Sequence, residues 1–471
     1  MRSPAANADT RLSLWRRVRE YAVPPSMIEA ATVRRRVGDW AGACAAARVD
    51  VDLDLRTVAR CHGRDMAARL RADLRHLAPD LLRWHMPRIA PDGLLRPGLT
   101  VSLARYGPAD HHGAEPVHLV VRTAPGWADA GQRISLALWA GSRDEADCPH
   151  PQARPDRRFR LDLHRHLWDA RRAGELRSRS GAPELAVDNA AAMRPDPSWD
   201  ALRDRGYAVH RWAAEAAVLL QAEGRASGAV VVRIGPRRRL VLDVTPAGPD
   251  LRSSPAPRIA GASRAGGVVG LPVLPDAATW MTPDLELLRH GLIEVDRLHP
   301  LVAGALAPGQ PAAPACPDPD QGQDPGATPG LVPCRGDWHR IGLVDGVLQP
   351  LDHDPAEIRR EELLAALTGT PLPCLRAVDE AHRRPECLPD VRARLDHGDT
   401  AGALAAVEAL LGPDALLRSG ELREELETAA SRRITYGLFR SGLIEQGPPP
   451  RSQDWQSKRG NRSHPRHTIA R

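Results

Sequence analysis

The chain has 471 residues, with 65 Lys and Arg against 59 Asp and Glu, and a formal net charge of +6. Its only lysine is Lys458, which excludes a P-loop nucleotide site, the active-site lysine of a protein kinase, an SxxK nucleophile pair and a pyridoxal Schiff base. The 42% hydrophobic and 26% charged residues are ordinary for a globular chain of two to four domains.

Cysteine usage and hydropathy predict a soluble, cytoplasmic protein. No apolar run is long enough for a membrane span or a signal peptide, so no membrane partner is expected. The seven cysteines are odd in number and form no CxxC pair. We therefore expect neither a disulfide framework nor a structural zinc ribbon. The Arg-, Ala- and Pro-rich composition is typical of a bacterial high-GC genome.

The first 97 residues are predicted to be a helical region. Leu14, Val18, Tyr21 and Ala22 recur at helical spacing, and the pattern from Met66 to Leu77 indicates another amphipathic helix.

From Leu99 the apolar period changes to two, which predicts an antiparallel meander in a domain over 98–250. Its strands are expected around 99–103, 117–121, 134–138 and 159–166. The spacing of apolar residues from Trp199 to Leu220 predicts one long helix. A hairpin over 228–244 is expected to turn at Gly235-Pro236.

Two linkers are predicted, at 251–270 and 307–330, with a short helical segment over 271–306 between them. The second linker carries seven prolines in 24 residues and cannot bury enough apolar surface to fold. A C-terminal domain over 331–445 opens with a hairpin whose Asp345-Gly346 pair favours a type I′ turn. Asp354-Pro355 predicts the start of a helix. Residues 446–471 are predicted to be a basic, disordered tail.

One short motif occurs twice, in VRRRVGDWAGACAAA (33–47) and VRARLDHGDTAGALAAV (391–407). In both copies, Gly can adopt the left-handed conformation that ends one helix, and Asp can cap the next. The pattern is similar to the turn of tetratricopeptide-like helical hairpins, but the full 34-residue repeat is absent. We therefore predict a helix-hairpin device.

The candidate metal site is Asp162, His164 and His166. On a strand these side chains share one face, and imidazoles with a carboxylate suit zinc or another divalent metal. A neighbouring strand is expected to add His118, and a loop His111 and His112. The alternative is an ordinary solvated strand face. Three further Cys–His pairings, from Cys61, Cys148 and Cys334, have no partner that the sequence can place.

The candidate polyanion-binding residues lie in the tail: Arg451, Lys458, Arg459, Arg462 and Arg466. The tail carries a net charge of +5, whereas residues 1–445 hold 59 basic and 58 acidic side chains. Any nucleic-acid partner is therefore expected to bind the tail.

These observations predict an α+β protein with helical terminal parts around a central antiparallel sheet. The leading hypothesis is a non-enzymatic interaction or adaptor protein with an unidentified protein partner. No catalytic or cofactor-binding residue is predicted. One alternative is a metal-dependent hydrolase that uses the Asp162 cluster with a divalent metal. Another is a nucleic-acid-associated protein that uses the tail.

Overall fold

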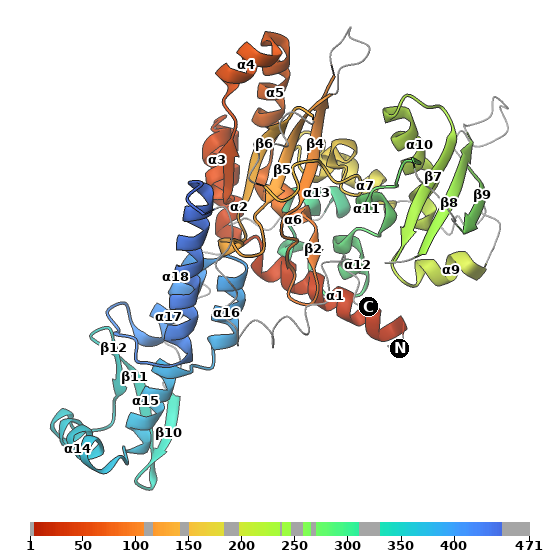
Figure 1. Ribbon diagram of the computed structural model, residues 1–471. Coiled ribbons are helices and arrows are strands. Elements are labelled where there is room, and N and C mark those ends of the chain that lie inside the picture. Colours follow the sequence, from red (N-terminus) through yellow and green to blue (C-terminus); the bar gives the residue numbers. More distant parts are fainter. Residues whose placement is uncertain are drawn as a thin grey trace. The chain divides into compact units, whose positions relative to one another are not determined.

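The computed structural model describes residues 4–107, 116–141, 150–182, 197–235, 238–245, 258–264, 270–309 and 330–444. The chain forms two compact units (Figure 1). Unit 1 contains the described parts of 1–127 and 133–313, and unit 2 contains 128–132 and the described part of 314–445. Both units combine helices with strands, so the predicted α+β class is confirmed.

Unit 1 is built on a four-stranded sheet of order β1-β6-β5-β4. Strands β4, β5 and β6 form the predicted antiparallel meander, and β1 adds to it in parallel. The strands are β1 (Val49–Asp52), β4 (Thr100–Tyr106), β5 (Val117–Thr123) and β6 (Ile134–Trp139). The N-terminal region is therefore not purely helical, because Val49-Asp50-Val51-Asp52 alternates with strand period and pairs with β6.

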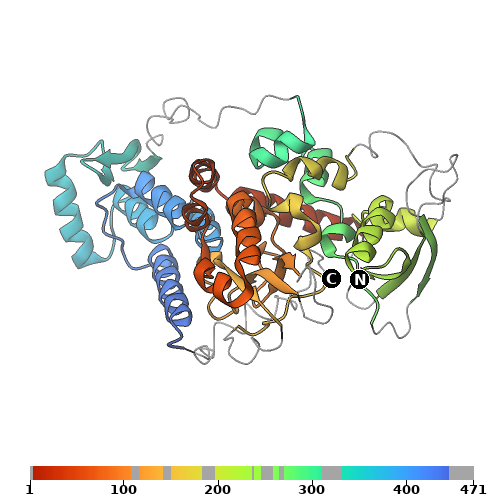
Figure 2. The same cartoon turned by 90° about the horizontal axis from the view of Figure 1, so that it is seen from above.

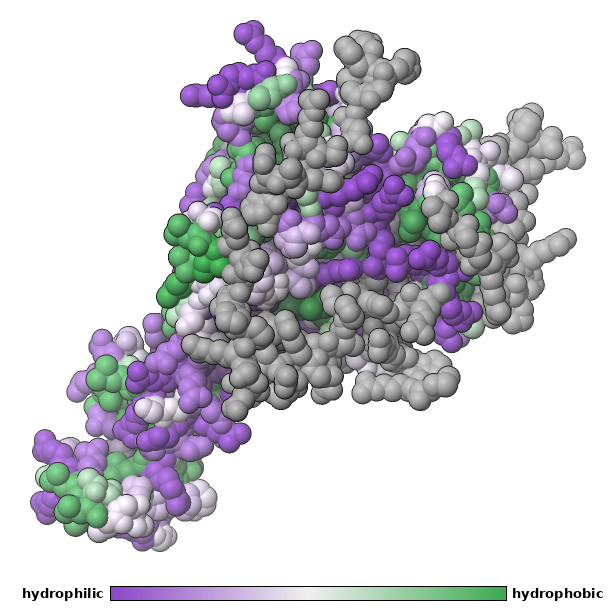
Figure 3. Space-filling model, in the orientation of Figure 1, coloured by the Kyte–Doolittle hydropathy of each residue, from purple (hydrophilic) through white to green (hydrophobic). Residues whose placement is uncertain are grey.

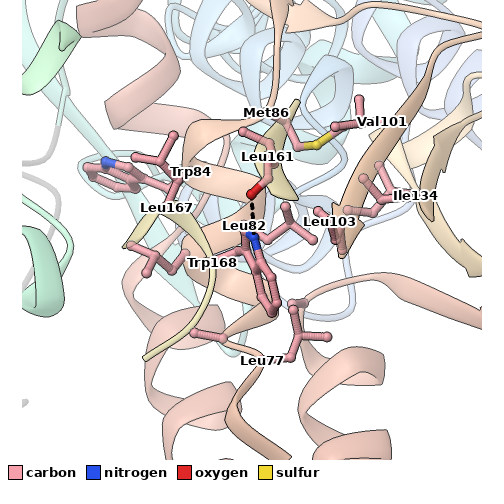
Figure 4. Packing of buried hydrophobic residues seen from close by; sticks show 14 of the residues in the cluster. Leu77, Leu82, Trp84, Met86, Val101, Leu103, Ile134, Leu161, Leu167 and Trp168 are labelled. Carbon is pink, nitrogen blue, oxygen red and sulfur yellow. Dashed lines mark hydrogen bonds between the residues drawn. The ribbon is translucent and has the colours of Figure 1, made fainter. Parts of the chain in front are cut away.

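Helices from both ends of unit 1 pack around this sheet. They are α1 (Pro4–Tyr21), α2 (Pro25–Arg36), α3 (Trp40–Ala46), α4 (Leu55–His62), α5 (Arg64–His76), α6 (Pro79–His85), α7 (Leu176–Arg179), α11 (Asp276–Thr279), α12 (Pro283–Arg289) and α13 (Pro300–Leu306). A small ribbon joins β2 (Arg88–Ile89) to β3 (Leu94–Leu95). In the core (Figure 4), Trp168 is fully buried and donates its indole N–H to the Leu161 carbonyl at 3.0 Å.

The segment after the meander is not the predicted fourth strand. It forms the short 3-10 helices η3 (Leu161–Leu163) and η4 (Arg165–Leu167), followed by η5 (Ala173–Glu175). Leu161, Leu167 and Trp168 are all buried. A 3-10 turn places residues three apart on one side, so this segment buries apolar side chains with only an isolated bridge to β4, between Arg160 and Ser102. The alternation of apolar residues therefore wrongly predicted a strand.

A second sheet in unit 1 has the order β7-β8-β9. It contains the predicted hairpin of β7 (Gly228–Ile234) and β8 (Arg238–Thr245), and α10 (Trp212–Ala222) packs on it (Figure 2). Strand β9 (Arg258–Arg264) pairs with β8. The linker prediction for 251–270 is therefore wrong at these residues, where the open edge of β8 provides hydrogen-bonding partners that composition does not reveal.

The predicted long helix over 199–220 is interrupted. It consists of α9 (Pro197–Arg203), η7 (Val209–Arg211) and α10. The break lies at Gly206, whose φ of +82° ends the first helix.

Unit 2 joins a three-stranded sheet to five helices. The strands are β10 (Gly330–Cys334), β11 (Asp337–Val344) and β12 (Val347–Pro350), in that order. The helices are α14 (Pro355–Thr368), α15 (Pro373–Arg383), α16 (Leu388–Asp396), α17 (Thr400–Leu411) and α18 (Glu421–Arg440). Asp345 and Gly346 both have positive φ, so the predicted turn is confirmed, and Asp354 accepts from Ala356 N as the predicted helix cap.

Both copies of the Gly-Asp motif form the predicted device. Gly38 and Gly398 have φ of +80° and +84°, and Asp39 and Asp399 accept hydrogen bonds from the backbone N–H three residues later. The turns join α2 to α3 and α16 to α17.

None of the helices that the structure describes is both long and apolar enough to cross a membrane.

Candidate metal centre

A hairpin in unit 2 places one cysteine and one histidine on the same face of a sheet. Cys334 pairs with Asp337, and Val332 pairs with His339, across β10 and β11. Directly paired residues share a face, so Cys334 and His339 lie diagonally on one face. Arg335 and Gly336 make the connecting turn with φ of +55° and +95°, as a type I′ turn requires.

Two further side chains reach this face from later elements. His353 follows β12, and Cys374 lies in the first turn of α15, which packs against the sheet. Pro373 occupies the first helical position, where its missing N–H costs nothing. The helix start therefore fixes the position of the Cys374 thiol, next to backbone N–H groups that favour a thiolate.

The four residues form a compact set of metal-binding groups. One ligand atom from each of Cys334, His339, His353 and Cys374 lies within 4.8 Å of all the others. His339 Nδ1 and His353 Nε2 are 2.7 Å apart. Both cysteines are buried and both histidines are half-buried. Among the described residues, no other group of three or more His, Cys, Asp or Glu side chains meets the same geometry.

The donor set fits zinc. Two thiolates and two imidazoles at tetrahedral corners are a common structural zinc site, with donor atoms about 3.3–3.8 Å apart. To reach that geometry, the longest separation, at most 4.8 Å, must shorten by up to about 1 Å, and the 2.7 Å between His339 Nδ1 and His353 Nε2 must lengthen by about 0.6 Å. Burial, and then the hydrogen bond with Cys334, raise the pKa of the Cys374 thiol to about 12. A bound cation reverses this preference, because thiols that ligate zinc are deprotonated.

Charged side chains surround the ligands. His353 Nδ1 lies 3.6 Å from Glu357 Oε2, so a carboxylate faces the ring nitrogen opposite the one that meets His339. Arg335 pairs with both Glu357 and Glu361. Such a carboxylate fixes the tautomer of a ligating histidine and increases its basicity.

Asp352 holds the strand that leads to His353. It accepts a hydrogen bond from the Arg340 backbone N–H at 2.7 Å and pairs with the Arg340 guanidinium at 2.8 Å. The hydrogen bond from the Arg340 side chain, and then the one from its backbone N–H, lower the pKa of Asp352 to about 2.

Four protein ligands make this a closed site. A catalytic zinc keeps one position open for water or substrate, whereas four side-chain ligands fill the tetrahedron. The chemistry that the arrangement supports is therefore cross-linking of the sheet to α15.

The sequence-predicted residues of unit 1 have other partners. Asp162 accepts two hydrogen bonds from Arg160 Nε and one from Arg160 Nη2, at 2.8–3.1 Å. His164 Nε2 lies 3.2 Å from Glu215 and its Nδ1 contacts the Arg160 carbonyl. His164 and His166 are neighbours, with ring centroids 5.8 Å apart, but the 3-10 turns do not align them with Asp162 as a strand would. Metal binding at this cluster stays a prediction.

His118 lies on β5, where its Nδ1 is 2.9 Å from Ser102 Oγ. Burial, followed by the charge of Arg105, lowers the pKa of His118 to about 4. Ser102 is fully buried, so this serine–histidine pair lies within the core.

The remaining predicted residues lie outside the described residues. They are His111, His112 and Cys148, and in the tail Arg451, Lys458, Arg459, Arg462 and Arg466.

Sequence reasoning missed the metal centre because its ligands follow the spacing Cys-x4-His-x13-His-x20-Cys. The expectation of no structural zinc ribbon rested on the absence of CxxC pairs. The signal that was present is Cys334 and His339 on either side of a turn, directly before the predicted Asp345-Gly346 hairpin.

The chain matches no family model, and comparison with curated proteins and with solved structures finds no similar protein.

Proposed function

We propose that the chain is a non-enzymatic interaction protein whose unit 2 is stabilised by one zinc ion. The observation that carries the proposal is the convergence of Cys334, His339, His353 and Cys374 within 4.8 Å. The closed ligand set favours a structural role over catalysis. The hydrophobic core of unit 2 lies among α16, α17 and α18, with Leu348 of the sheet packed against it, and the metal would add a direct link between the sheet and α15.

The proposal explains why buried thiols and half-buried imidazoles gather at an end of unit 2 whose apolar side chains are mostly exposed. In α14, none of the residues is buried. Zinc sites contribute folding free energy directly, because the unfolded chain has no preformed site.

The test is the zinc content of purified full-length protein and of two matched variants. We expect one zinc per chain in the parent and in Cys387→Ser, since Cys387 lies in the same unit but outside the ligand set. Cys374→Ser is expected to lose at least 90% of the metal. Tetrahedral cobalt absorption in the parent alone gives a second readout. Equal zinc in the two variants contradicts the proposal.

A further inference from the structure

The sheet of unit 2 has a second face, opposite the metal centre, that is apolar and exposed. Its strand residues alternate with the ligand-bearing ones: Leu331 pairs with Arg340, Pro333 with Trp338, and Val344 with Val347. Leu331 is 60% exposed, Trp338 67% and Val347 44%. We call Leu331, Trp338, Val344 and Val347 the outer sheet face. An exposed tryptophan among aliphatic side chains is typical of an interaction site.

An acidic side chain lies at one end of the outer sheet face. Asp345 is in the turn that joins Val344 to Val347, whereas Asp337 pairs with Cys334 and so lies on the metal-centre face. Both are exposed. The one guanidinium within the face, that of Arg340, is already paired with Asp352. This combination suits a cationic ligand, because the face of an indole ring attracts guanidinium and ammonium groups.

The net charge of the chain over 330–445 favours the same ligand. Residues 330–445 hold 14 arginines against 20 acidic residues, a net charge of −6. Residues 1–329 hold 45 basic against 38 acidic residues, a net charge of +7. The tail over 446–471 carries +5. The tail is therefore attracted by unit 2 and repelled by unit 1.

The tail is long enough to reach the outer sheet face. α15 leads away from the metal centre, and its last residue, Arg383, contacts Gly420, directly before α18. The two helices, of 11 and 20 residues, together measure about 45 Å at 1.5 Å per residue. Lys458 lies 18 residues beyond Arg440, and an extended segment of that length spans about 60 Å.

We propose that the basic tail, residues 446–471, docks on the outer sheet face, with arginine or lysine side chains over Trp338 and against Asp345. The docking rests on the proposed zinc-stabilised fold, which holds the sheet in place. It identifies an acidic protein surface, in place of nucleic acid, as the polyanion that the tail binds.

The single lysine makes a direct test. A water-soluble carbodiimide joins a lysine amine to a carboxylate with no spacer, and Lys458 is the only lysine side chain. Full-length, nuclease-treated protein is cross-linked at 20 mM salt and analysed by peptide mass spectrometry. We expect Lys458 to be joined mainly to Asp345, and the yield to fall in 500 mM salt, where the Debye length shrinks to about 4 Å.

Variants separate docking from chance encounter. We expect Trp338→Ala with Leu331→Ala, both within the face, to reduce the Lys458–Asp345 cross-link roughly fivefold. The control is Leu367→Ser on α14, 85% exposed and part of a separate apolar patch with Leu363 and Leu364 (Figure 3). That control should leave the yield unchanged. Mixing light and isotopically heavy protein shows whether the tail binds its own chain or a second copy, and either result supports the docking.

Three results overturn the proposal: cross-links spread over carboxylates in proportion to their exposure, cross-links to unit 1, or an equal yield in the double variant. Protein that retains nucleic acid on the tail and shows no cross-link also overturns it. Zinc is measured on the same samples. Bound zinc without the cross-link refutes the docking alone, whereas absent zinc refutes the proposed function.

Discussion

At the scale of single residues, buried charges in unit 1 are held by specific partners. The Arg19 guanidinium donates to both carboxylate oxygens of Asp284 at 2.6 and 2.9 Å, and Trp84 Nε1 donates to the same carboxylate at 3.2 Å. Burial lowers the pKa of Arg19, and the Asp284 carboxylate opposes that shift. This pair ties α1 to α12, 265 residues apart.

We expect Asp284→Asn to destabilise unit 1 by about 3–5 kcal/mol, because removing one partner leaves a buried charge uncompensated. Urea unfolding followed by circular dichroism measures the change. The control is Asp200→Asn, whose side chain is 63% exposed and pairs with Arg203, and it should cost less than about 0.5 kcal/mol. Similar costs for the two variants contradict the assignment.

Buried neutral histidines predict acid sensitivity of unit 1. Burial is the main cause that lowers the pKa of both His85 and His118 to about 4, whereas an unfolded histidine titrates near 6.5. Between these values the unfolded chain binds protons that the folded chain does not. The free energy of unfolding therefore falls as the pH drops from about 6.5 to 4, by up to about 1.4 kcal/mol per pH unit for each histidine.

Denaturant unfolding at a series of pH values tests this expectation. His118→Gln should reduce the slope over that range, and His62→Gln, at an exposed position, should not. A parent protein whose stability stays flat between pH 6.5 and 4 is the contrary result.

At the scale of elements, the repeated Gly-Asp turn has one difference between its copies. A Cβ added at Gly398 would lie 2.2 Å from the Gly131 carbonyl oxygen, whereas one at Gly38 meets nothing within 4 Å. Both glycines have positive φ. The same local motif therefore carries a packing constraint in unit 2 only.

We expect Gly38→Ala to cost about 1 kcal/mol, the strain of an L-residue at positive φ. Gly398→Ala should cost about 3 kcal/mol or more, because the backbone of Gly131 must also move. Thermal unfolding of the two variants measures the difference. If the two variants have the same melting temperature, the close contact between Gly398 and the Gly131 backbone is wrong.

Local signals in the sequence predicted the elements whose chemistry is local. The Asp345-Gly346 turn, the Asp354 cap and the two Gly-Asp hairpins depend on a few adjacent residues, and each formed as predicted. The strand over 159–166 failed because alternation alone does not supply a pairing partner. β9 was missed for the converse reason, since its partner, β8, lies outside its own sequence.

The metal centre needed distant information. Its four ligands are spread over 41 residues and come from two strand ends, a loop and a helix start. Only Cys334 was singled out from the sequence, and no partner could be placed for it. The packing of α15 against the sheet, which brings Cys374 to the hairpin, has no local signature.

At the scale of the whole molecule, the nearly neutral balance over residues 1–445 conceals a division of charge. The boundary between the units separates a basic unit 1 from an acidic unit 2. The basic tail therefore follows directly on the acidic part of the chain. The sequence alone predicted an unidentified protein partner, with nucleic acid as the alternative that uses the tail, and the division of charge favours an acidic surface of the chain as the partner of the tail.

Zinc removal should affect the two units differently. Ligand that binds only the folded state stabilises it by about 4 kcal/mol at 1,000 times its dissociation constant. We expect calorimetry to show that EDTA lowers the melting temperature of unit 2 and leaves that of unit 1 unchanged. The protease-sensitive sites that appear with EDTA should lie within 330–383. A shift of both transitions, or of neither, contradicts a zinc site confined to unit 2.

Native mass spectrometry of the full chain tests the proposed zinc site. Binding of Zn²⁺ by two thiolates replaces two protons, so the chain should have a mass about 63 Da above that of the metal-free chain. The added mass should persist in Cys387→Ser and disappear in Cys374→Ser. A chain that carries no added mass after purification with zinc, or a Cys374→Ser variant that retains it, would show that the four residues do not form the proposed centre.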